Sequence, residues 1–122
     1  MRLIETKEDL FVALADSYDS VILILKTSNI CGQSKRAYEK FKDLEKKYKE
    51  IESQMFVLVV QDAKGVSDYI SETFGIVHES PQAIVIRNED VIYYEDHAKI
   101  DIEKTTHLLK EKTPANGNYE ET

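Results

Sequence analysis

The residue of this sequence best suited to chemistry is its single cysteine, Cys31, which Ser34 follows three positions later. Cys31 stands between an apolar run at 21–25 and a stretch with helical periodicity from residue 37, so we expect it in a loop that enters a helix. The free N–H groups and the dipole at a helix N-terminus stabilise an anion, and they lower a cysteine pKa from its usual value of about 8.5. This position predicts a reactive thiol; the alternative is an inert, small apolar side chain.

Polar side chains next to Cys31 favour the thiolate form. Ser34 can direct its hydroxyl toward the sulfur, and Lys35 and Arg36 place positive charge in the first turns of the expected helix. Between residues 35 and 50, seven basic residues outnumber four acidic ones. For each single cation, a solvated helix surface is the alternative interpretation.

The elements that must position these residues follow from the apolar pattern. Unbroken apolar runs predict strands that are covered on both faces, and apolar residues at helical spacing predict amphipathic helices. The expected elements are, in order, a helix at 7–17, a strand at 21–25, a long helix that begins after Cys31 and has its apolar stripe at 37–51, a strand at 56–60, a helix at 66–74, strands at 82–86 and 91–94, and a helix that follows Asp101.

This order is that of the thioredoxin fold, which belongs to the α/β class. The strand–helix–strand crossover is right-handed and makes its two strands parallel, and the later hairpin adds an antiparallel pair. We therefore predict a four-stranded mixed sheet, with two parallel crossover strands plus an antiparallel hairpin, flanked by helices. Residues 1–112 form this thioredoxin-like domain in the prediction, and residues 113–122, which lack an apolar pattern, form a flexible C-terminal tail.

Pro81, one of only two prolines, stands directly before the third expected strand. In this fold that strand begins with a cis proline, and a cis bond is rare and structural. A cis Ser80–Pro81 bond would bring the Ser80 backbone to Cys31, where it could pair with an extended substrate; the alternative is an ordinary trans proline. The nearby His78, or His97 in the loop before the last helix, could support the thiolate as an imidazolium.

Composition limits the classes of function. Hydrophobic residues make up 42% of the chain and charged residues 32%, which suits one globular domain. The formal net charge of −7 disfavours nucleic-acid binding, because affinity for phosphates requires cations. No apolar run approaches the ~20 residues that cross a bilayer, and the first residues lack the apolar stretch of a signal peptide. We therefore expect a cytoplasmic protein, whose lone cysteine cannot close an intrachain disulfide.

Several segments of the chain resemble the monothiol bacilliredoxins of the YtxJ type, thioredoxin-like proteins of Firmicutes that make bacillithiol. The resemblance covers about residues 3–109. It rests on Lys26 to Cys31, on Ser34, on Ala37 to Phe41 and, most specifically, on Glu72 to Gln82. The chain departs from the family at one place, because Cys31-Gly32-Gln33-Ser34 replaces the usual Cys-Pro-Ile-Ser. The cysteine and the serine are both kept.

The resemblance implies a thiol–disulfide oxidoreductase that removes bacillithiol from mixed disulfides on other proteins. Cys31 would attack the bacillithiol sulfur, with Ser34 as the second catalytic residue, and an external thiol would resolve the adduct. Bacillithiol is then a co-substrate, and we expect no bound cofactor and no metal. The expected partners are S-bacillithiolated proteins and the resolving thiol, without nucleic acid or membrane, and we expect a monomer.

The same resemblance implies a set of substrate-binding residues. Because bacillithiol carries a malate moiety, Lys26, Lys35 and Arg36 are candidate partners for its carboxylates. The other expected substrate-binding residues lie in the loops around the thiol: Thr27, Gly32, Gln33, Ser80, Pro81 and His97.

Two other classes of function compete with this interpretation. Cys31-Gly32-Gln33-Ser34 also resembles the Cys-Gly-Phe-Ser of monothiol glutaredoxins, which carry iron–sulfur clusters with glutathione. Those proteins need a glycine pair after the hairpin, and residues 94–99 contain no glycine. The second alternative is an interaction module that has the fold but no redox activity. The pKa of Cys31 separates it from an oxidoreductase, because a value near that of a free thiol would favour the inactive module.

Overall fold

A five-stranded sheet forms the middle layer of the protein in a computed structural model that describes residues 1–111. The strands are β1 (Arg2–Leu3), β2 (Ile22–Thr27), β3 (Met55–Val59), β4 (Gln82–Arg87) and β5 (Asp90–Asp96), in the spatial order β1-β3-β2-β4-β5. β3 runs parallel to both β1 and β2, whereas β4 runs antiparallel to β2 and β5 antiparallel to β4. The predicted crossover and hairpin are therefore confirmed. The predicted strand count of four is wrong by one, because the two residues of β1 are too few to form a pattern.

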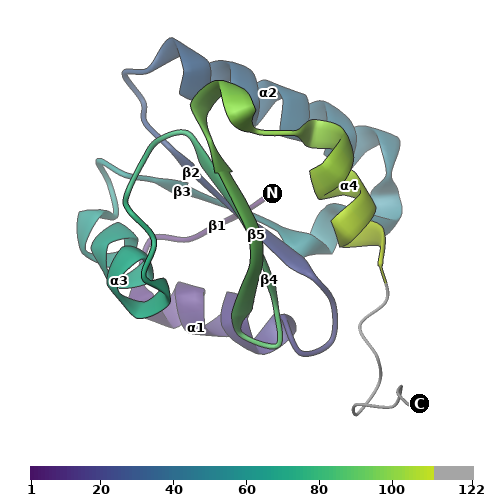
Figure 1. Cartoon of the computed structure of the whole chain (residues 1–122), viewed down its shortest axis with the longest axis horizontal. Helices are drawn as coiled ribbons and strands as arrows, with labels where there is room; N and C mark the ends of the chain where they lie inside the picture. Colours follow the sequence, from purple (N-terminus) through teal and green to yellow (C-terminus); the bar gives the residue numbers. More distant parts are fainter. Residues whose placement is uncertain (112–122) are drawn as a thin grey trace.

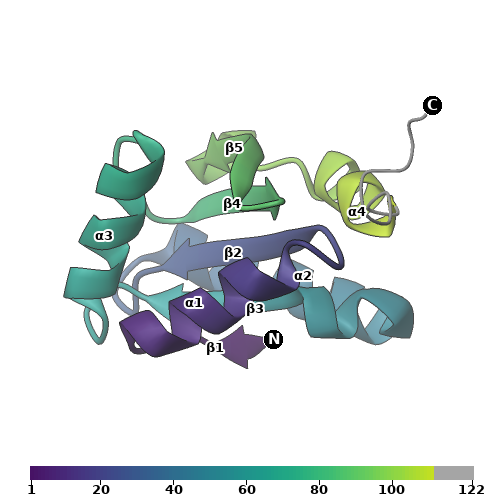
Figure 2. The ribbon, with the colours of Figure 1, turned by 90° about the horizontal axis from the view of Figure 1, so that it is seen from below.

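Helices cover both faces of the sheet, as Figures 1 and 2 show. The helices are α1 (Lys7–Asp16), α2 (Gly32–Lys47), α3 (Lys64–Phe74) and α4 (Ile102–Lys110), with short 3-10 helices η1 (Lys49–Gln54) and η2 (His97–Lys99). One apolar core lies between the sheet and α1 and α3, and the other lies between the sheet and α2 and α4. This is the α/β arrangement that the order of elements predicts.

The central strand β2 explains why its sequence shows no alternation. Ile22 and Ile24 pack into the core under α1 and α3, whereas Leu23 and Leu25 pack into the core under α2 and α4. All four side chains have no exposed surface. A strand that is buried on both faces needs apolar residues at every position.

Local signals fixed several ends of helices. The Thr6 side chain accepts a hydrogen bond from the Asp9 backbone N–H and begins α1, and Asp101 caps α4 in the same way. Gly75 ends α3 with φ of +66°, the left-handed conformation expected of it. The predicted helix at 37–51 is too long at its C-terminal end, because α2 stops at Lys47.

Two expectations concern the chain as a whole: its flexible C-terminal tail and the absence of a membrane-spanning segment. The expected tail at 113–122 lies outside the described residues, so it and the domain limit at residue 112 stay predictions. Within residues 1–111, no helix has both the length and the apolar character required to cross a membrane.

Candidate active site

Cys31 is the N-cap residue of α2, directly after the loop that leaves β2. Its backbone is extended, with φ of −112° and ψ of 122°, and its side chain is partly exposed. The backbone N–H of Ser34 is the strongest influence that lowers the pKa of the Cys31 thiol, and the N–H of Gln33, the Ser34 hydroxyl and the Arg36 guanidinium act in the same direction against partial burial. The thiol is therefore accessible and its anion is stabilised, as its place at a helix start predicts.

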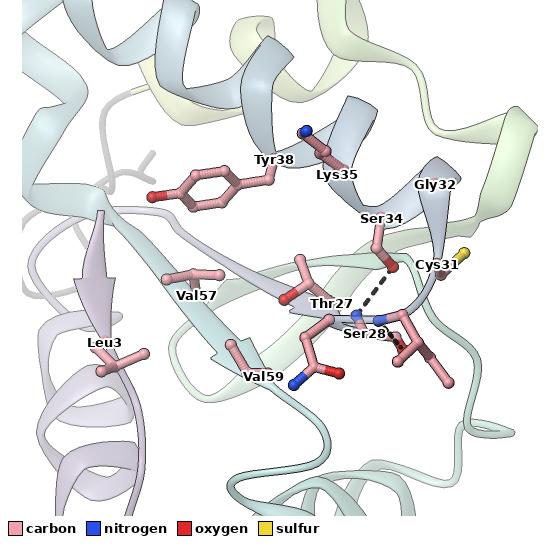
Figure 3. Close-up of a pocket in the computed structure, with 12 residues that line it drawn as sticks. Leu3, Thr27, Ser28, Cys31, Gly32, Ser34, Lys35, Tyr38, Val57 and Val59 are labelled. Carbon is pink, nitrogen blue, oxygen red and sulfur yellow. Dashed lines mark hydrogen bonds between the residues drawn. The ribbon is translucent and has the colours of Figure 1, made fainter.

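Ser34 connects the first turn of α2 to the loop that precedes it. Its side chain is 1% exposed, and its hydroxyl oxygen accepts a hydrogen bond from the Ser28 backbone N–H at 3.0 Å (Figure 3). Since that bond uses a lone pair, the hydroxyl proton stays available to the Cys31 sulfur. The structure thus places Ser34 where the spacing of the two residues predicts it.

Gln61, in the loop after β3, forms two hydrogen bonds with the loop that precedes Cys31. Its amide nitrogen donates to the Ser28 hydroxyl at 2.7 Å, and its amide oxygen accepts from the Asn29 backbone N–H at 3.1 Å. Gln61 was not among the residues predicted from the sequence. A single glutamine about thirty positions away along the chain leaves no local pattern, and only the pairing of β2 with β3 brings it to the site.

The Ser80–Pro81 peptide bond is cis. The Pro81 carbonyl oxygen accepts a hydrogen bond from the His97 backbone N–H at 2.9 Å. The His97 ring nitrogens lie 3.3 Å from Gln33 Oε1 and 2.7 Å from Glu79 Oε1. His97 therefore joins the first turn of α2 to the loop that carries Pro81, and the three expected residues Gln33, Pro81 and His97 come together.

An apolar hollow of about 550 Å³ opens beside the Cys31 loop, between α2 and the strands β1 and β3 (Figure 3). Leu3, Tyr38, Val57 and Val59 contribute apolar and aromatic side chains to its wall. Figure 3 shows the Cys31 sulfur at the rim, directed away from Val57. Three of the predicted substrate-binding residues line this hollow, Thr27, Gly32 and Lys35, together with the two predicted catalytic residues, Cys31 and Ser34.

Lys26 does not occupy the position that the resemblance implied. Its side chain has no exposed surface, and its ammonium donates to the Ser67 carbonyl oxygen at 3.0 Å and to the Ser71 hydroxyl at 2.9 Å, both on α3. Burial lowers the pKa of Lys26 to about 8. The expectation that Lys26 binds a substrate carboxylate is therefore wrong, because its charge faces the interior. His78 also lies in this cluster, with Nδ1 3.3 Å from the Lys26 ammonium.

The two remaining cations of the prediction are exposed and lie on different sides of α2. Lys35 lines the apolar hollow, and Arg36 lines a second hollow that faces η2. Ser80 is half-buried in the loop before Pro81. Within residues 1–111, no group of three or more His, Cys, Asp or Glu side chains is arranged to hold a metal ion.

Comparison with known proteins bears on both the fold and the family. The family model described as monothiol bacilliredoxin BrxC matches residues 2–105. A structure described as that of an oxidoreductase with a thioredoxin fold has a TM-score of 0.75 and 24% sequence identity, over 90% of this chain and 93% of the other.

Two solved thioredoxins are similar in the same way. Fasciola hepatica thioredoxin has a TM-score of 0.72 at 19% identity, over 88% of this chain and 99% of its own. Malassezia sympodialis thioredoxin has a TM-score of 0.70 at 13% identity, over 93% of this chain and 90% of its own. At these identities the similarity shows the fold, and the predicted thioredoxin-like fold is confirmed.

Proposed function

This chain belongs to the monothiol bacilliredoxin family, and we propose that it removes bacillithiol from mixed disulfides on other proteins. Membership of the family supports a thiol oxidoreductase; bacillithiol as the group removed is our proposal. The observation that carries the proposal is the position of Cys31, an accessible thiol of lowered pKa at the N-terminus of α2. Cys31 is the only cysteine in the chain, so its reaction must be that of a single thiol.

The proposed reaction is a disulfide exchange. The Cys31 thiolate attacks the bacillithiol sulfur of the mixed disulfide, and a new Cys31–bacillithiol disulfide forms. The bond between the bacillithiol sulfur and the protein sulfur breaks, and the substrate protein leaves as a thiolate that takes a proton from water. Since one disulfide replaces another, this step needs no external oxidant or reductant.

A second exchange must then restore Cys31. The chain has no other cysteine, so the second thiol comes from outside. It attacks the bacillithiol sulfur of the adduct, becomes a disulfide with bacillithiol, and releases the Cys31 thiolate. The groups that stabilise this thiolate, the Ser34 N–H foremost, also make Cys31 a good leaving group in this step.

The loop that ends in the cis Ser80–Pro81 bond supplies a backbone for the substrate in this proposal. The half-buried Ser80 has peptide groups that could pair with an extended segment around the modified cysteine. His97 connects this loop to α2, because its backbone N–H donates to the Pro81 carbonyl oxygen and its ring contacts Gln33.

The experiment that tests the proposal is mass spectrometry of the purified protein after separate incubation with oxidised bacillithiol, oxidised glutathione and coenzyme A disulfide. We expect an adduct on Cys31 with bacillithiol in preference to the other two. We also expect the protein to remove bacillithiol from a modified test protein, and Cys31→Ser to abolish this activity. Full activity of Cys31→Ser, or equal adducts with all three disulfides, would contradict the proposal.

The lowered pKa of Cys31 also bears on the inactive interaction module. Such a module has no need of a stabilised thiolate, whereas Gln33, Ser34 and Arg36 all lower the pKa of the thiol. A measured thiol pKa near that of free cysteine would favour the module. Visible absorption after anaerobic reconstitution with iron and sulfide would favour a cluster carrier.

A further inference from the structure

The first turns of α2 separate two hollows of different chemistry near Cys31. On one side, Lys35 and Tyr38 border the apolar hollow that is shown in Figure 3. On the other side, Arg36 and Lys40 line a groove that faces η2. Residues four positions apart lie on the same face of a helix, so Arg36 and Lys40 present two cations to one site.

The groove between α2 and η2 has a volume of about 260 Å³ and a basic lining. Arg36, Lys40 and His97 are its charged or titratable residues, and no aspartate or glutamate among the described residues lines it. The rest of its wall is uncharged: Gln33, Ala37, Ala98, Ile100 and Ile102. In a chain with a formal net charge of −7, a groove that presents only basic groups is suited to an anion.

Neither of the two α2 cations is neutralised by a neighbour. Within residues 1–111, Arg36 and Lys40 form no ion pair, whereas Lys42 on the same helix lies 3.0 Å from Glu45. The charge nearest to His97 is Glu79, which contacts its Nε2 at 2.7 Å and does not line the groove. Arginine and lysine side chains are therefore available to a carboxylate from outside.

Cys31 does not line the groove, but Arg36, which does, extends toward the residue next to the cysteine. A Cβ atom built on Gly32, the residue next to Cys31, would lie 3.5 Å from Arg36 Nη1. Arg36 is also the charged side chain that lowers the pKa of the Cys31 thiol. A small ligand could thus have its sulfur at Cys31 and its anionic end in the groove.

We propose that the groove between α2 and η2 binds the carboxylates of the low-molecular-weight thiol through Arg36 and Lys40, and that the apolar hollow is left for the protein half of the mixed disulfide. The inference rests on the proposed function, in which that thiol is bacillithiol with its malate moiety. In this proposal the lysine partner of the carboxylates is Lys40 and not the buried Lys26, and Lys40 was not among the binding residues predicted from the sequence.

The test compares an anionic disulfide with an uncharged one. Second-order rate constants for Cys31 would be measured with oxidised bacillithiol and with bis(2-hydroxyethyl) disulfide, for the wild type, Lys40→Glu and Lys46→Glu. The uncharged disulfide corrects for any change in the reactivity of the thiol itself. Lys46, an exposed α2 residue outside both hollows, is the matched control because its variant changes the net charge by the same amount.

The quantity compared is the rate constant with oxidised bacillithiol divided by that with bis(2-hydroxyethyl) disulfide. We expect Lys40→Glu to lower this ratio about tenfold or more, because a charge-assisted contact is lost. Lys46→Glu should change the ratio less than about twofold. An unchanged ratio in Lys40→Glu would overturn the groove and leave the proposed function standing. A decrease in Lys35→Glu as large as that in Lys40→Glu would also overturn it, because the anion would then bind on the other side of α2. If the wild type forms no adduct with bacillithiol, the proposed function and the groove both fail.

Discussion

The backbone N–H of Ser28 donates a hydrogen bond to the hydroxyl oxygen of Ser34 at 3.0 Å. This bond ties the loop before Cys31 to the first turn of α2, so that the residues on both sides of the cysteine are fixed. The same hydroxyl lowers the pKa of the Cys31 thiol, because its proton can be donated to the sulfur. One serine therefore shapes the loop and stabilises the thiolate.

Replacing this serine should affect both properties. We expect Ser34→Ala to raise the pKa of Cys31 and to slow its reaction with disulfides below neutral pH, where less thiolate is then present. Because the partly buried Ser28 N–H loses its partner, the free energy of unfolding should fall by about 1 kcal/mol. Thiolate absorbance against pH and urea denaturation measure the two effects. Ser67→Ala, at an equally buried serine on α3, serves as the control and should leave the thiol pKa unchanged.

The contact of His97 with Gln33 and Glu79 should control the loop that carries Pro81. We expect His97→Ala to weaken this connection by about 1 kcal/mol, which corresponds to roughly fivefold faster hydrogen exchange at the backbone N–H of residue 97, the group that donates to the Pro81 carbonyl oxygen. The rate constant with a bacillithiolated protein should fall by a similar factor.

The control for this prediction is His107→Ala, because the His107 side chain is 80% exposed and lies on α4. It should change neither the exchange rate nor the reaction. If the protection of the backbone N–H of residue 97 is the same in His97→Ala and in the wild type, the His97 side chain does not hold the loop.

The structural features that can be predicted from this sequence are those determined by residues close to one another along the chain. The cysteine at a helix start and the helix that follows Asp101 each depend on residues within a few positions. Gln61 and Lys26 are different, because the pairing of strands and the packing of α3 decide what they touch.

The direction in which the Lys26 side chain points is the clearest example of a feature that the sequence does not predict. The residue ends an apolar run, and a lysine at the end of a strand is as compatible with an exposed ligand contact as with a buried bond to a helix. Its neighbours Ser67 and Ser71 lie more than forty positions away along the chain. No periodicity within β2 distinguishes the two orientations, since both faces of the strand are buried.

The apolar hollow should matter for protein substrates more than for small disulfides. Tyr38 forms part of its wall and is 37% exposed. We expect Tyr38→Ala to lower the rate constant with a bacillithiolated protein about three- to tenfold, the cost of about 1 kcal/mol of lost apolar contact. The rate constant with oxidised bacillithiol should change less than about twofold. Tyr94→Ala, an exposed tyrosine on β5, is the matched control, and an equal loss in both reactions would contradict this assignment of the hollow.

The buried ammonium of Lys26 should make stability depend on pH in alkaline solution. The pKa of Lys26 is about 8 in the folded protein and 10.5 without burial, so the folded state releases its proton first. Below pH 8 the lysine is charged in both states and the folded protein bears the full cost of burying that charge, at most about 3 kcal/mol. Between pH 8 and 10.5 the unfolded chain binds more protons than the folded one, so this cost disappears as the pH rises.

Lys26→Met, which replaces the charge with an apolar side chain of similar length, removes this dependence. We therefore expect Lys26→Met to be more stable than the wild type at pH 7, by up to about 3 kcal/mol, and the difference to shrink steadily between pH 8 and 10.5. Urea denaturation at a series of pH values measures it. Lys64→Met, at an exposed lysine on α3, should follow the wild-type curve. A difference that stays constant from pH 7 to 10 would mean that Lys26 keeps an ordinary pKa, because a lysine that titrates alike in both states contributes no slope.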